Sequence, residues 1–465
     1  MKKSITLGLP YLPYVSSFSL ILCLSVQAGE PLPLSKSYWK DESFLKSFNA
    51  SYRINSRIEP NVSTTERGAL VSIQSLMADG KRKEALQKLK SSSSFSSSAA
   101  LLFNAGNIEF ELGNTSEAQA HYQQSLALFP NFRRAHKNLG FLYAKEGDWE
   151  KALLSLEESI ELGDQDGATY GQLAYGRMAQ QQYSSALQAY RLAQVTQPDN
   201  LDWKAGIAQC LQHVARHEEA IVLLDEVIMA RPTEAAYYLL QASIQLDVGD
   251  QESALVNLDL VRRMSADQLS GDNYLLLAQL HMRSGSAVLA EPLLTKSFLA
   301  TKKPSLERSL DTLKLITETA DWKLARSFSD QISNAFPQVS DEKLSPEKKR
   351  LSALIDIASG ANPSRGAEVL DGLISEDPLD AAAMIILARH RVSEGRFDES
   401  EMLLQQAARV DDSTYEAKVA LAKLYVSQKR YEEALSQLDS AIKLQRTESM
   451  IEYRTAVSRL AETQR

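Results

Sequence analysis

Apolar residues recur every three or four positions along most of the chain. In "GDWEKALLSLEESIEL", residues 147–162, the residues at this spacing are Trp149, Ala152, Leu153, Leu156 and Ile160. Such spacing places the apolar side chains on one face of an α-helix. A single amphipathic helix of this length is marginal in water, so it must pack against another element. The pattern therefore predicts helices that each bury one face against neighbouring helices.

The helical pattern itself repeats at a fixed period. Five alanines follow one another at one constant interval: Ala118, Ala152, Ala186, Ala220 and Ala254. A second column of tiny side chains runs ahead of the first at a constant offset: Gly106, Gly140, Ala174, Ala208 and Ala242. Tiny side chains in both columns allow two helices to cross at close range, and prolines such as Pro130 and Pro198 end the second helix. We therefore predict helix–turn–helix units stacked into an all-α solenoid.

The alanine column continues beyond these five units with less regular spacing. It includes Ala85 upstream and, downstream, Ala290, Ala325, Ala367, Ser400 and Ala434. About eleven units are predicted over residues 66–445, with a polar insertion near residues 338–350. Residues 446–465 are predicted to form a capping helix with Met450, Val457 and Leu460 facing inward.

The repeat pattern resembles the tetratricopeptide repeat (TPR), which has a period of about 34 residues and small side chains at its eighth and twentieth positions. In "LGFLYAKEGDWEKAL", the consensus places hold Leu139, Gly140, Tyr143 and Ala152. The resemblance implies a TPR superhelix. Departures from the pattern concentrate after residue 260, so the unit boundaries there stay open.

Residues 1–65 lie outside the repeats. Lys2 and Lys3 precede an uncharged stretch that ends with the small residues Val26 and Ala28. This arrangement predicts a signal peptide over residues 1–28, and the alternative is an uncleaved membrane anchor. The extension over residues 29–65 is too rich in aromatic residues for a disordered tail. It is predicted either to cap the first unit or to be held for a partner.

Composition narrows the functional classes. A net charge of −8 gives no general electrostatic reason to bind nucleic acid, and no stretch after the signal is long and apolar enough to span a membrane. Removal of the signal takes Cys23 with it and leaves Cys210, so the mature chain would form no internal disulfide. Because apolar residues surround Cys210 on a predicted helix, we expect a buried hydrophobic residue there.

Motifs of catalysis are not recognisable in the sequence. It contains no GxxxxGK[ST] phosphate loop, GxSxG elbow or HExxH motif. His213 and His217 have a spacing that can hold a metal on one helix face, but the matching turns of other units are merely polar. We therefore predict no enzyme activity, no cofactor and no metal. A metal-binding protein or an enzyme is the remote alternative.

A solenoid offers an extended concave face for a protein partner. In TPR units, set positions of the first helix line this face, and the resemblance implies a peptide groove here formed by Phe103, Asn107, Phe110, Arg134, Lys137, Asn138, Phe141 and Tyr175. Aromatic side chains among cations and amides can hold a peptide through pockets and backbone hydrogen bonds. The alternative for Phe103 and Phe110 is that they fill the seam between units. Asn107 and Asn138 match a carboxylate clamp, but Phe103 and Ala168 stand where such a clamp needs lysine.

Three stretches resemble a narrower family. Residues 47–67, 131–175 and 197–211 look like the exported TPR proteins linked in Gram-negative bacteria with a TonB-type energy-transduction system. This resemblance implies a periplasmic accessory or scaffold role, with transduction subunits as partners, and it brings no catalytic residues. The alternative within binding is a general scaffold for envelope assembly or polysaccharide export.

Overall fold

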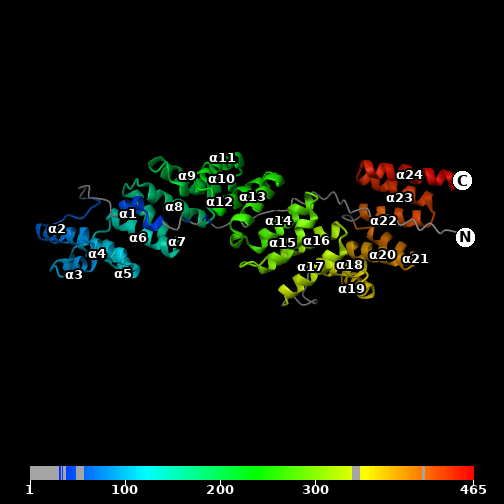
Figure 1. Ribbon diagram of the computed structural model, residues 1–465, viewed down its shortest axis with the longest axis horizontal. Coiled ribbons are helices and arrows are strands. Elements are labelled where there is room, and N and C mark those ends of the chain that lie inside the picture. The colour runs from blue at the N-terminus through cyan, green and yellow to red at the C-terminus, as the bar shows by residue number, and fades with distance from the viewer. Residues whose placement is uncertain are drawn as a thin grey trace. The chain divides into compact units, whose positions relative to one another are not determined.

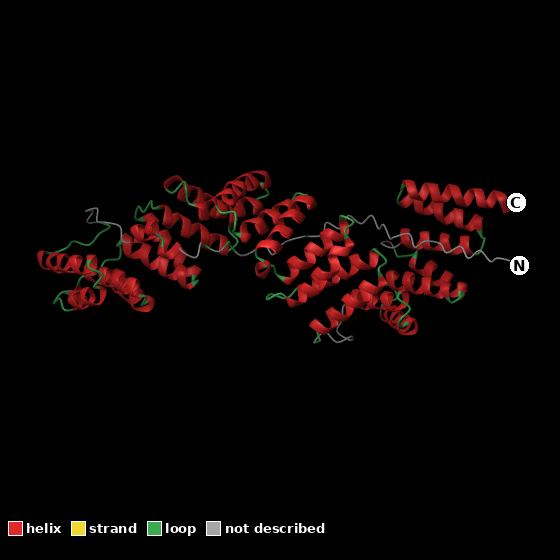
Figure 2. Ribbon diagram, in the orientation of Figure 1, coloured by secondary structure: helices red, strands yellow, loops and turns green. Residues whose placement is uncertain are grey.

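The computed structural model describes residues 31–32, 34, 38–48, 57–337, 346–410 and 414–464. Throughout these residues the regular structure is helical, and Figure 2 shows no strand among them. The described chain divides into two compact units, residues 31–268 and residues 269–464. The all-α class expected from the sequence is confirmed.

The first unit begins with helix η1, ends with helix η3 and contains α1 to α13 between them. Their bounds are η1 (Tyr38–Lys40), α1 (Glu42–Phe48), α2 (Thr64–Ala78), α3 (Arg82–Lys90), η2 (Phe95–Ser97), α4 (Ala99–Leu112), α5 (Thr115–Leu128), α6 (Arg133–Glu146), α7 (Trp149–Glu161), α8 (Gly167–Ala179), α9 (Tyr183–Thr196), α10 (Leu201–His213), α11 (His217–Ala230), α12 (Ala235–Asp247), α13 (Gln251–Met264) and η3 (Ala266–Gln268).

The second unit contains helices α14 to α24. Their bounds are α14 (Gly271–Arg283), α15 (Ala287–Leu299), α16 (Leu306–Glu318), α17 (Trp322–Ala335), α18 (Pro346–Ala358), α19 (Pro363–Glu376), α20 (Ala381–Ser393), α21 (Phe397–Ala407), α22 (Thr414–Ser427), α23 (Tyr431–Leu444) and α24 (Glu448–Gln464). Within each unit, consecutive helices pack in pairs (Figure 1). Across the described residues, α2 to α23 form the eleven helix pairs that the repeat predicts.

The tiny side chains of both columns lie where the paired helices cross. Ala118, Ala152 and Ala186 are fully buried on the second helices of their pairs. On the first helix of the α6–α7 pair, a methyl group at Gly140 would lie 2.8 Å from Cδ2 of Leu156. Because this is shorter than any ordinary carbon–carbon contact, the crossing leaves room for hydrogen alone. The columns therefore mark the closest approaches inside the pairs.

Several predicted segments fall at the edges of the described chain. The signal peptide (residues 1–28) and residues 338–345 of the polar insertion lie outside the described residues. Residues 346–350, assigned to that insertion from the sequence, are instead the first residues of α18. α24 packs on α23 with Val457 1% exposed, but Leu460 is 46% exposed, so the expectation that Leu460 faces inward is wrong. In the described part, no helix combines the length and hydropathy needed to cross a bilayer.

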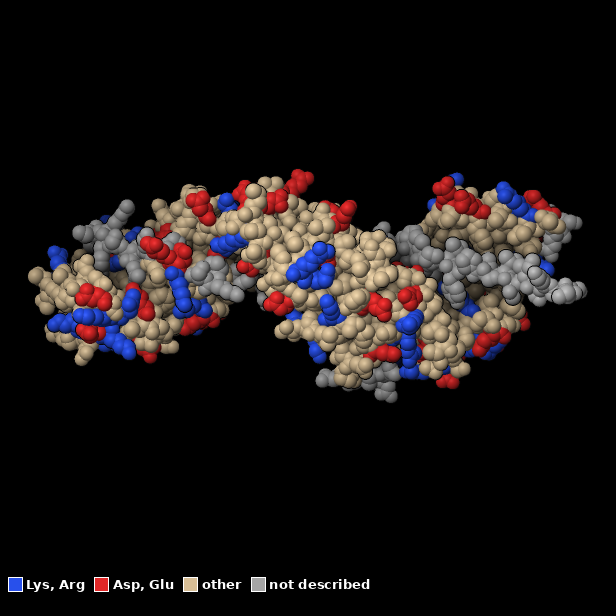
Figure 3. All heavy atoms as spheres, viewed as in Figure 1, with Lys and Arg blue, Asp and Glu red and all other residues tan. Residues whose placement is uncertain are grey.

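Charged side chains of both signs are mixed over the surface. Figure 3 shows lysines and arginines next to aspartates and glutamates on the visible face, with broad uncharged areas between them. Several of these charges form ion pairs, as Lys137 does with Asp166 at 3.3 Å between consecutive helix pairs and Arg231 with Asp202 at 2.8 Å. No large area of one sign is visible on that face.

Candidate functional site

The first helices of the pairs in the first unit form one continuous surface. We call the surface built from α4, α6, α8 and α10 the inner face; their partners α5, α7, α9 and α11 form the opposite layer. All eight residues predicted to line a groove belong to α4, α6 or α8. Most of them are buried in the folded chain. What covers several of them is the chain's own N-terminal segment, by which we mean the described residues 31–32, 34, 38–48 and 57–60.

Phe103 lies in the seam between two helix pairs. It is 1% exposed, and its ring centroid is 4.8 Å from that of Phe132 and 5.6 Å from that of Tyr122. The guanidinium carbon of Arg134 lies 4.9 Å from the centroid of the Phe103 ring. Phe103 therefore packs between the two helix pairs, in the position described by the alternative in which it fills the seam.

Phe110 and Phe141 present their rings to the N-terminal segment. Phe48 stacks on Phe110 with ring centroids 4.3 Å apart, and Phe44 lies 5.4 Å from Phe141. Lys145 completes the surroundings of Phe110, with its Nζ 4.8 Å from the ring centroid. These aromatic side chains therefore take part in an intramolecular contact.

Asn107 and Asn138 form a buried amide pair. Asn138 Nδ2 donates to Asn107 Oδ1 at 2.9 Å and to the main-chain carbonyl of Phe48 at 3.3 Å. The hydroxyl of Tyr122 donates to Asn107 Oδ1 at 2.6 Å. Burial raises the pKa of that tyrosine well above its usual range, so it stays a neutral donor. Asn138, which also donates to Asn107, thus binds a peptide carbonyl in place of the terminal carboxylate that a clamp would bind.

Two cations of α6 have acidic partners. Arg134 Nε donates to both carboxylate oxygens of Glu59, at 3.0 and 3.1 Å, and Lys137 Nζ lies 3.3 Å from Asp166 Oδ2. Burial raises the pKa of Glu59, and the positive charge of Arg134 acts against that rise. The main-chain nitrogen of Arg133 also donates to the carbonyl of Ile58 at 3.2 Å. The N-terminus of α6 therefore binds the end of the N-terminal segment.

Tyr175 lies further along the inner face, on α8. Its ring packs 5.1 Å from that of Trp149, and it lines a small cavity together with Leu32, Leu34 and Tyr237. α10 contributes Trp203, whose ring lies 5.6 Å from Tyr38, and Gln209, whose Oε1 accepts a hydrogen bond from Leu32 N at 2.8 Å. Sequence reasoning missed Trp203 and Gln209. The repeat pattern could have pointed to them, because α10 is the first helix of the helix pair that follows α8 and α9.

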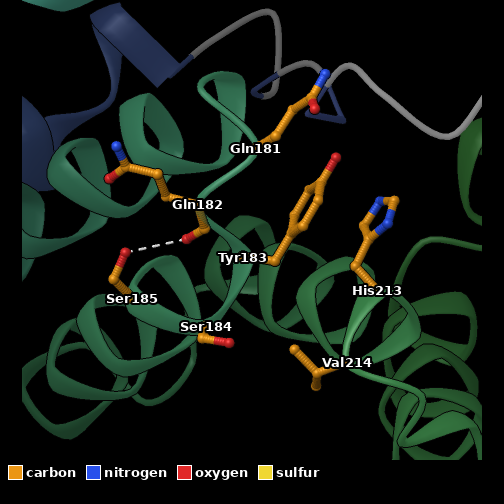
Figure 4. Close-up of a pocket in the computed structure, with 7 residues that line it drawn as sticks. All are labelled: Gln181, Gln182, Tyr183, Ser184, Ser185, His213 and Val214. Carbon is orange, nitrogen blue, oxygen red and sulfur yellow. Dashed lines mark hydrogen bonds between the residues drawn. The ribbon is translucent and has the colours of Figure 1, made fainter.

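His213 is the last residue of α10, and His217 is the first residue of α11. Tyr183 and His213 stack with ring centroids 3.7 Å apart in a shallow depression lined also by Gln181, Ser184 and Val214 (Figure 4). Burial lowers the pKa of His213, which favours the neutral ring. Among the described residues, no three side chains of the histidine, cysteine and acidic types gather in a way that would hold a metal ion. The depression offers polar groups without a converging charge.

Comparison with known proteins supports the repeat assignment. Family models of the tetratricopeptide repeat match residues 97–165, 177–244 and 391–460. The TPR repeat-containing protein YpiA of Bacillus subtilis is 26% identical over 156 residues, which are 33% of this chain and 37% of that protein. The match therefore spans little more than a third of the length of this relative.

Two of the solved structures with a similar fold are YrrB and yeast Tom70. YrrB, described as a TPR protein with an unusual peptide-binding site, has a TM-score of 0.36 at 18% identity, covering 44% of this chain and 97% of YrrB. Yeast Tom70 has a TM-score of 0.34 at 14% identity, covering 86% of this chain and 97% of Tom70.

The matching family models describe repeats and indicate no catalytic family. Tetratricopeptide-repeat proteins are typically non-enzymatic scaffolds for protein–protein interactions. The repeat matches agree with the paired helices and with the tiny residues at their crossings. The chain therefore contains tetratricopeptide repeats and folds as an all-α solenoid.

Proposed function

We propose that the protein is a non-enzymatic adaptor of the bacterial periplasm that binds segments of partner proteins on its inner face and serves a TonB-type energy-transduction system. The observation that carries the binding role is the way the inner face holds a polypeptide. The ring of Phe48 stacks on Phe110, the carbonyl of Phe48 accepts from Asn138, and the carboxylate of Glu59 pairs with Arg134. These are the contacts by which a folded surface holds a peptide of any origin.

The compartment and the system are supported by sequence features. Residues 1–28 have the pattern of a signal peptide, and residues 47–67, 131–175 and 197–211 resemble exported TPR proteins linked with TonB-type systems. An accessory subunit of such a system needs a surface for other proteins and no chemistry of its own. A scaffold for envelope assembly or polysaccharide export has the same needs, so partner identity separates the two roles.

A site-directed photo-crosslinking experiment in cells that carry the gene at its own locus tests the proposed role. Tyr175, half-buried on the inner face, is replaced by the photoreactive residue p-benzoylphenylalanine. The matched control carries the same residue at Leu192, which is 49% exposed on α9. We expect mass spectrometry to identify energy-transduction subunits crosslinked from position 175 and absent from position 192.

The outcomes separate the candidate roles. Crosslinks from position 175 to assembly or export proteins alone would move the assignment to the envelope-scaffold alternative. Equal crosslinking from both positions would contradict binding on the inner face. The compartment is tested separately, by fractionation and by sequencing the N-terminus of the isolated protein, where a chain that begins at Gly29 is expected. A cytoplasmic chain that begins at Met1 would contradict export.

A further inference from the structure

The N-terminal segment follows the inner face from one repeat to the next. Leu32 contacts α10, Tyr38 packs against Trp203 of the same helix, and α1 lies over α6 and α4 (Figure 1). Glu59 then pairs with Arg134 at the N-terminus of α6. One short stretch of chain thus covers a surface contributed by successive repeats, which is how a solenoid accommodates an extended ligand.

Aromatic side chains anchor this stretch. Phe44 and Phe48 stand four residues apart on α1, so both project from one side of the helix. They are 1% and 2% exposed, and Tyr38 is 5% exposed. Large, almost fully buried aromatic side chains of this kind are the usual hot spots of protein interfaces.

Polar contacts fix the position of the stretch along the inner face. The carbonyl of Phe48 accepts from Asn138, and the main-chain nitrogen of Leu32 donates to Gln209. Both of these hydrogen bonds are made to main-chain atoms of the N-terminal segment. The two-oxygen contact of Glu59 with Arg134 reads a carboxylate, with geometry that is favourable for this pair.

The stretch has the properties of a ligand more than those of a repeat. α1 has seven residues, and an isolated helix of that length is not stable in water. Its apolar side packs on the inner face and on Tyr38 and Trp39 of the same segment, whereas α4 to α11 pair with one another through their own small residues. The repeats therefore have their packing partners without α1, whereas among the described residues outside the repeats α1 packs on η1, a single turn of three residues.

We propose that the N-terminal segment, in its described residues, is an intramolecular ligand that occupies the peptide-binding face, and that the partner bound by this face is a peptide of the same chemistry. That peptide has a short helix with aromatic residues one turn apart, preceded by further aromatic residues and followed by a carboxylate. The inference rests on the proposed role of the inner face in binding protein. The N-terminal segment then competes with the partner, and only partners that displace it are bound.

The covalent connection sets the strength of this competition. A short tether gives a local concentration on the order of 1 mM, so a free peptide at micromolar concentration is disfavoured at equal intrinsic affinity. Weakening the tethered copy should therefore strengthen binding of the free peptide. This inverse relation distinguishes a tethered ligand from a permanent part of the fold.

The experiment uses the full chain and a fluorescein-labelled synthetic peptide with the sequence of residues 31–62, followed by fluorescence anisotropy. The test variant carries Phe44→Ala and Phe48→Ala in the chain, while the peptide keeps both phenylalanines. We expect the variant to bind the peptide at least about tenfold more tightly than the wild-type chain does. A peptide with both phenylalanines replaced by alanine is the matched negative control.

A second substitution locates the binding. Arg134→Ala, added to the double variant, should weaken peptide binding by about tenfold or more, because Glu59 of the peptide loses its partner. Leu192→Ala on α9, added to the same background, should leave the binding constant unchanged. Equal effects of the two substitutions would contradict binding on the inner face.

Each remaining result decides the inference. If the double variant keeps its helical circular dichroism but binds the peptide no more tightly than wild type, the segment is not a displaceable ligand. If the double variant unfolds, the segment belongs to the core, and the inference is likewise overturned. A wild-type dimer that the peptide converts to monomer would show exchange between two copies instead. Tight peptide binding without transduction subunits in the crosslinking experiment would overturn the TonB-type role alone.

Discussion

At Gly140, the side chain is a single hydrogen because Leu156 of the paired helix occupies the space beside it. A methyl group there would lie 2.8 Å from Leu156 Cδ2 and 3.2 Å from the Leu156 main-chain nitrogen. The side chain can move, but the main chain of α7 is held by its own hydrogen bonds. The requirement for a tiny residue is therefore a property of the crossing, which every regular unit reproduces.

We predict that Gly140→Ala destabilises the first unit by about 1–3 kcal/mol, the usual cost of overpacking a close contact. The matched control is Gly372→Ala, also inside a helix, where a methyl group would meet no atom within 4 Å. This control should be neutral or stabilising by about 0.5–1 kcal/mol, because alanine favours the helix. Urea unfolding followed by tryptophan fluorescence measures both; equal effects would contradict the packing argument.

The second residue with a testable consequence is Cys210. It is fully buried, and burial raises the pKa of its thiol to about 12. At pH 8 about one thiol in ten thousand would be the reactive thiolate, even if reagent could reach it.

We therefore predict that the native Cys23→Ser chain, in which Cys210 is the remaining cysteine, reacts with Ellman's reagent only as fast as the protein unfolds. The same chain in guanidinium chloride should release one equivalent of the coloured thiolate at once. Labelling of the native chain within seconds would mean that Cys210 is exposed to solvent.

Between the helices of a pair, the turn needs one residue in the left-handed region. Glycine fills this place at Gly113, Gly147 and Gly249, but Gln181 and Ala215 adopt φ values of 61° and 58° in the units between them. A residue with a side chain pays about 1–2 kcal/mol for this conformation. The turns are thus equivalent in backbone geometry but unequal in strain.

We predict that Ala215→Gly stabilises the first unit by about 0.5–1 kcal/mol, since relief of strain exceeds the added flexibility of the unfolded chain. Ala215 is exposed, so no packing is lost. Gly147→Ala in the equivalent turn is the reciprocal variant and should destabilise by about 1 kcal/mol. A lower urea midpoint for Ala215→Gly would refute the strain explanation.

Ion pairs between consecutive helix pairs are a second feature that recurs along the chain. Arg82 pairs with Glu111, Lys137 with Asp166, and Arg430 with Glu401, each across 29 residues. Such partly exposed pairs contribute little free energy individually. Their regular separation follows from the repeat, because residues nearly one period apart occupy neighbouring units. The ion pairs therefore reflect the regular spacing of the repeats more than they determine the stability of the solenoid.

In the whole molecule, most contacts join neighbouring repeats, so a local defect should stay local. The second unit offers a sharp test at Gly271, the first residue of α14. A methyl group there would lie 2.3 Å from the nitrogen of Pro304 and 2.5 Å from the carbonyl oxygen of Ser297. Both are main-chain atoms that cannot turn away as a side chain would.

We predict that Gly271→Ala lowers the hydrogen-exchange protection of α14, α15 and α16 by about tenfold or more, with α4 to α7 unchanged. The Gly372→Ala chain serves as the control, with protection unchanged in both regions. Uniform loss of protection along the chain would show instead that the whole protein unfolds as one cooperative unit.

The sequence by itself determined the paired helices, their eleven-fold repetition and the places where they cross. These features depend on contacts within one or two repeats, and such contacts leave a periodic trace in residue size and polarity. Gly106, Gly140 and the fully buried alanines carry that trace because a larger side chain at a crossing would separate the helices.

Only the tertiary structure decided what lies on the inner face. The residues predicted to line a groove are of types that can bind a peptide, but Phe110, Asn138 and Arg134 contact the chain's own N-terminal segment. Leu32 and Gln209 are 177 residues apart, and no periodicity relates them. Their contact depends on the path of the folded chain across several repeats, because the aromatic side chains of the N-terminal segment are buried against a surface that successive repeats build together.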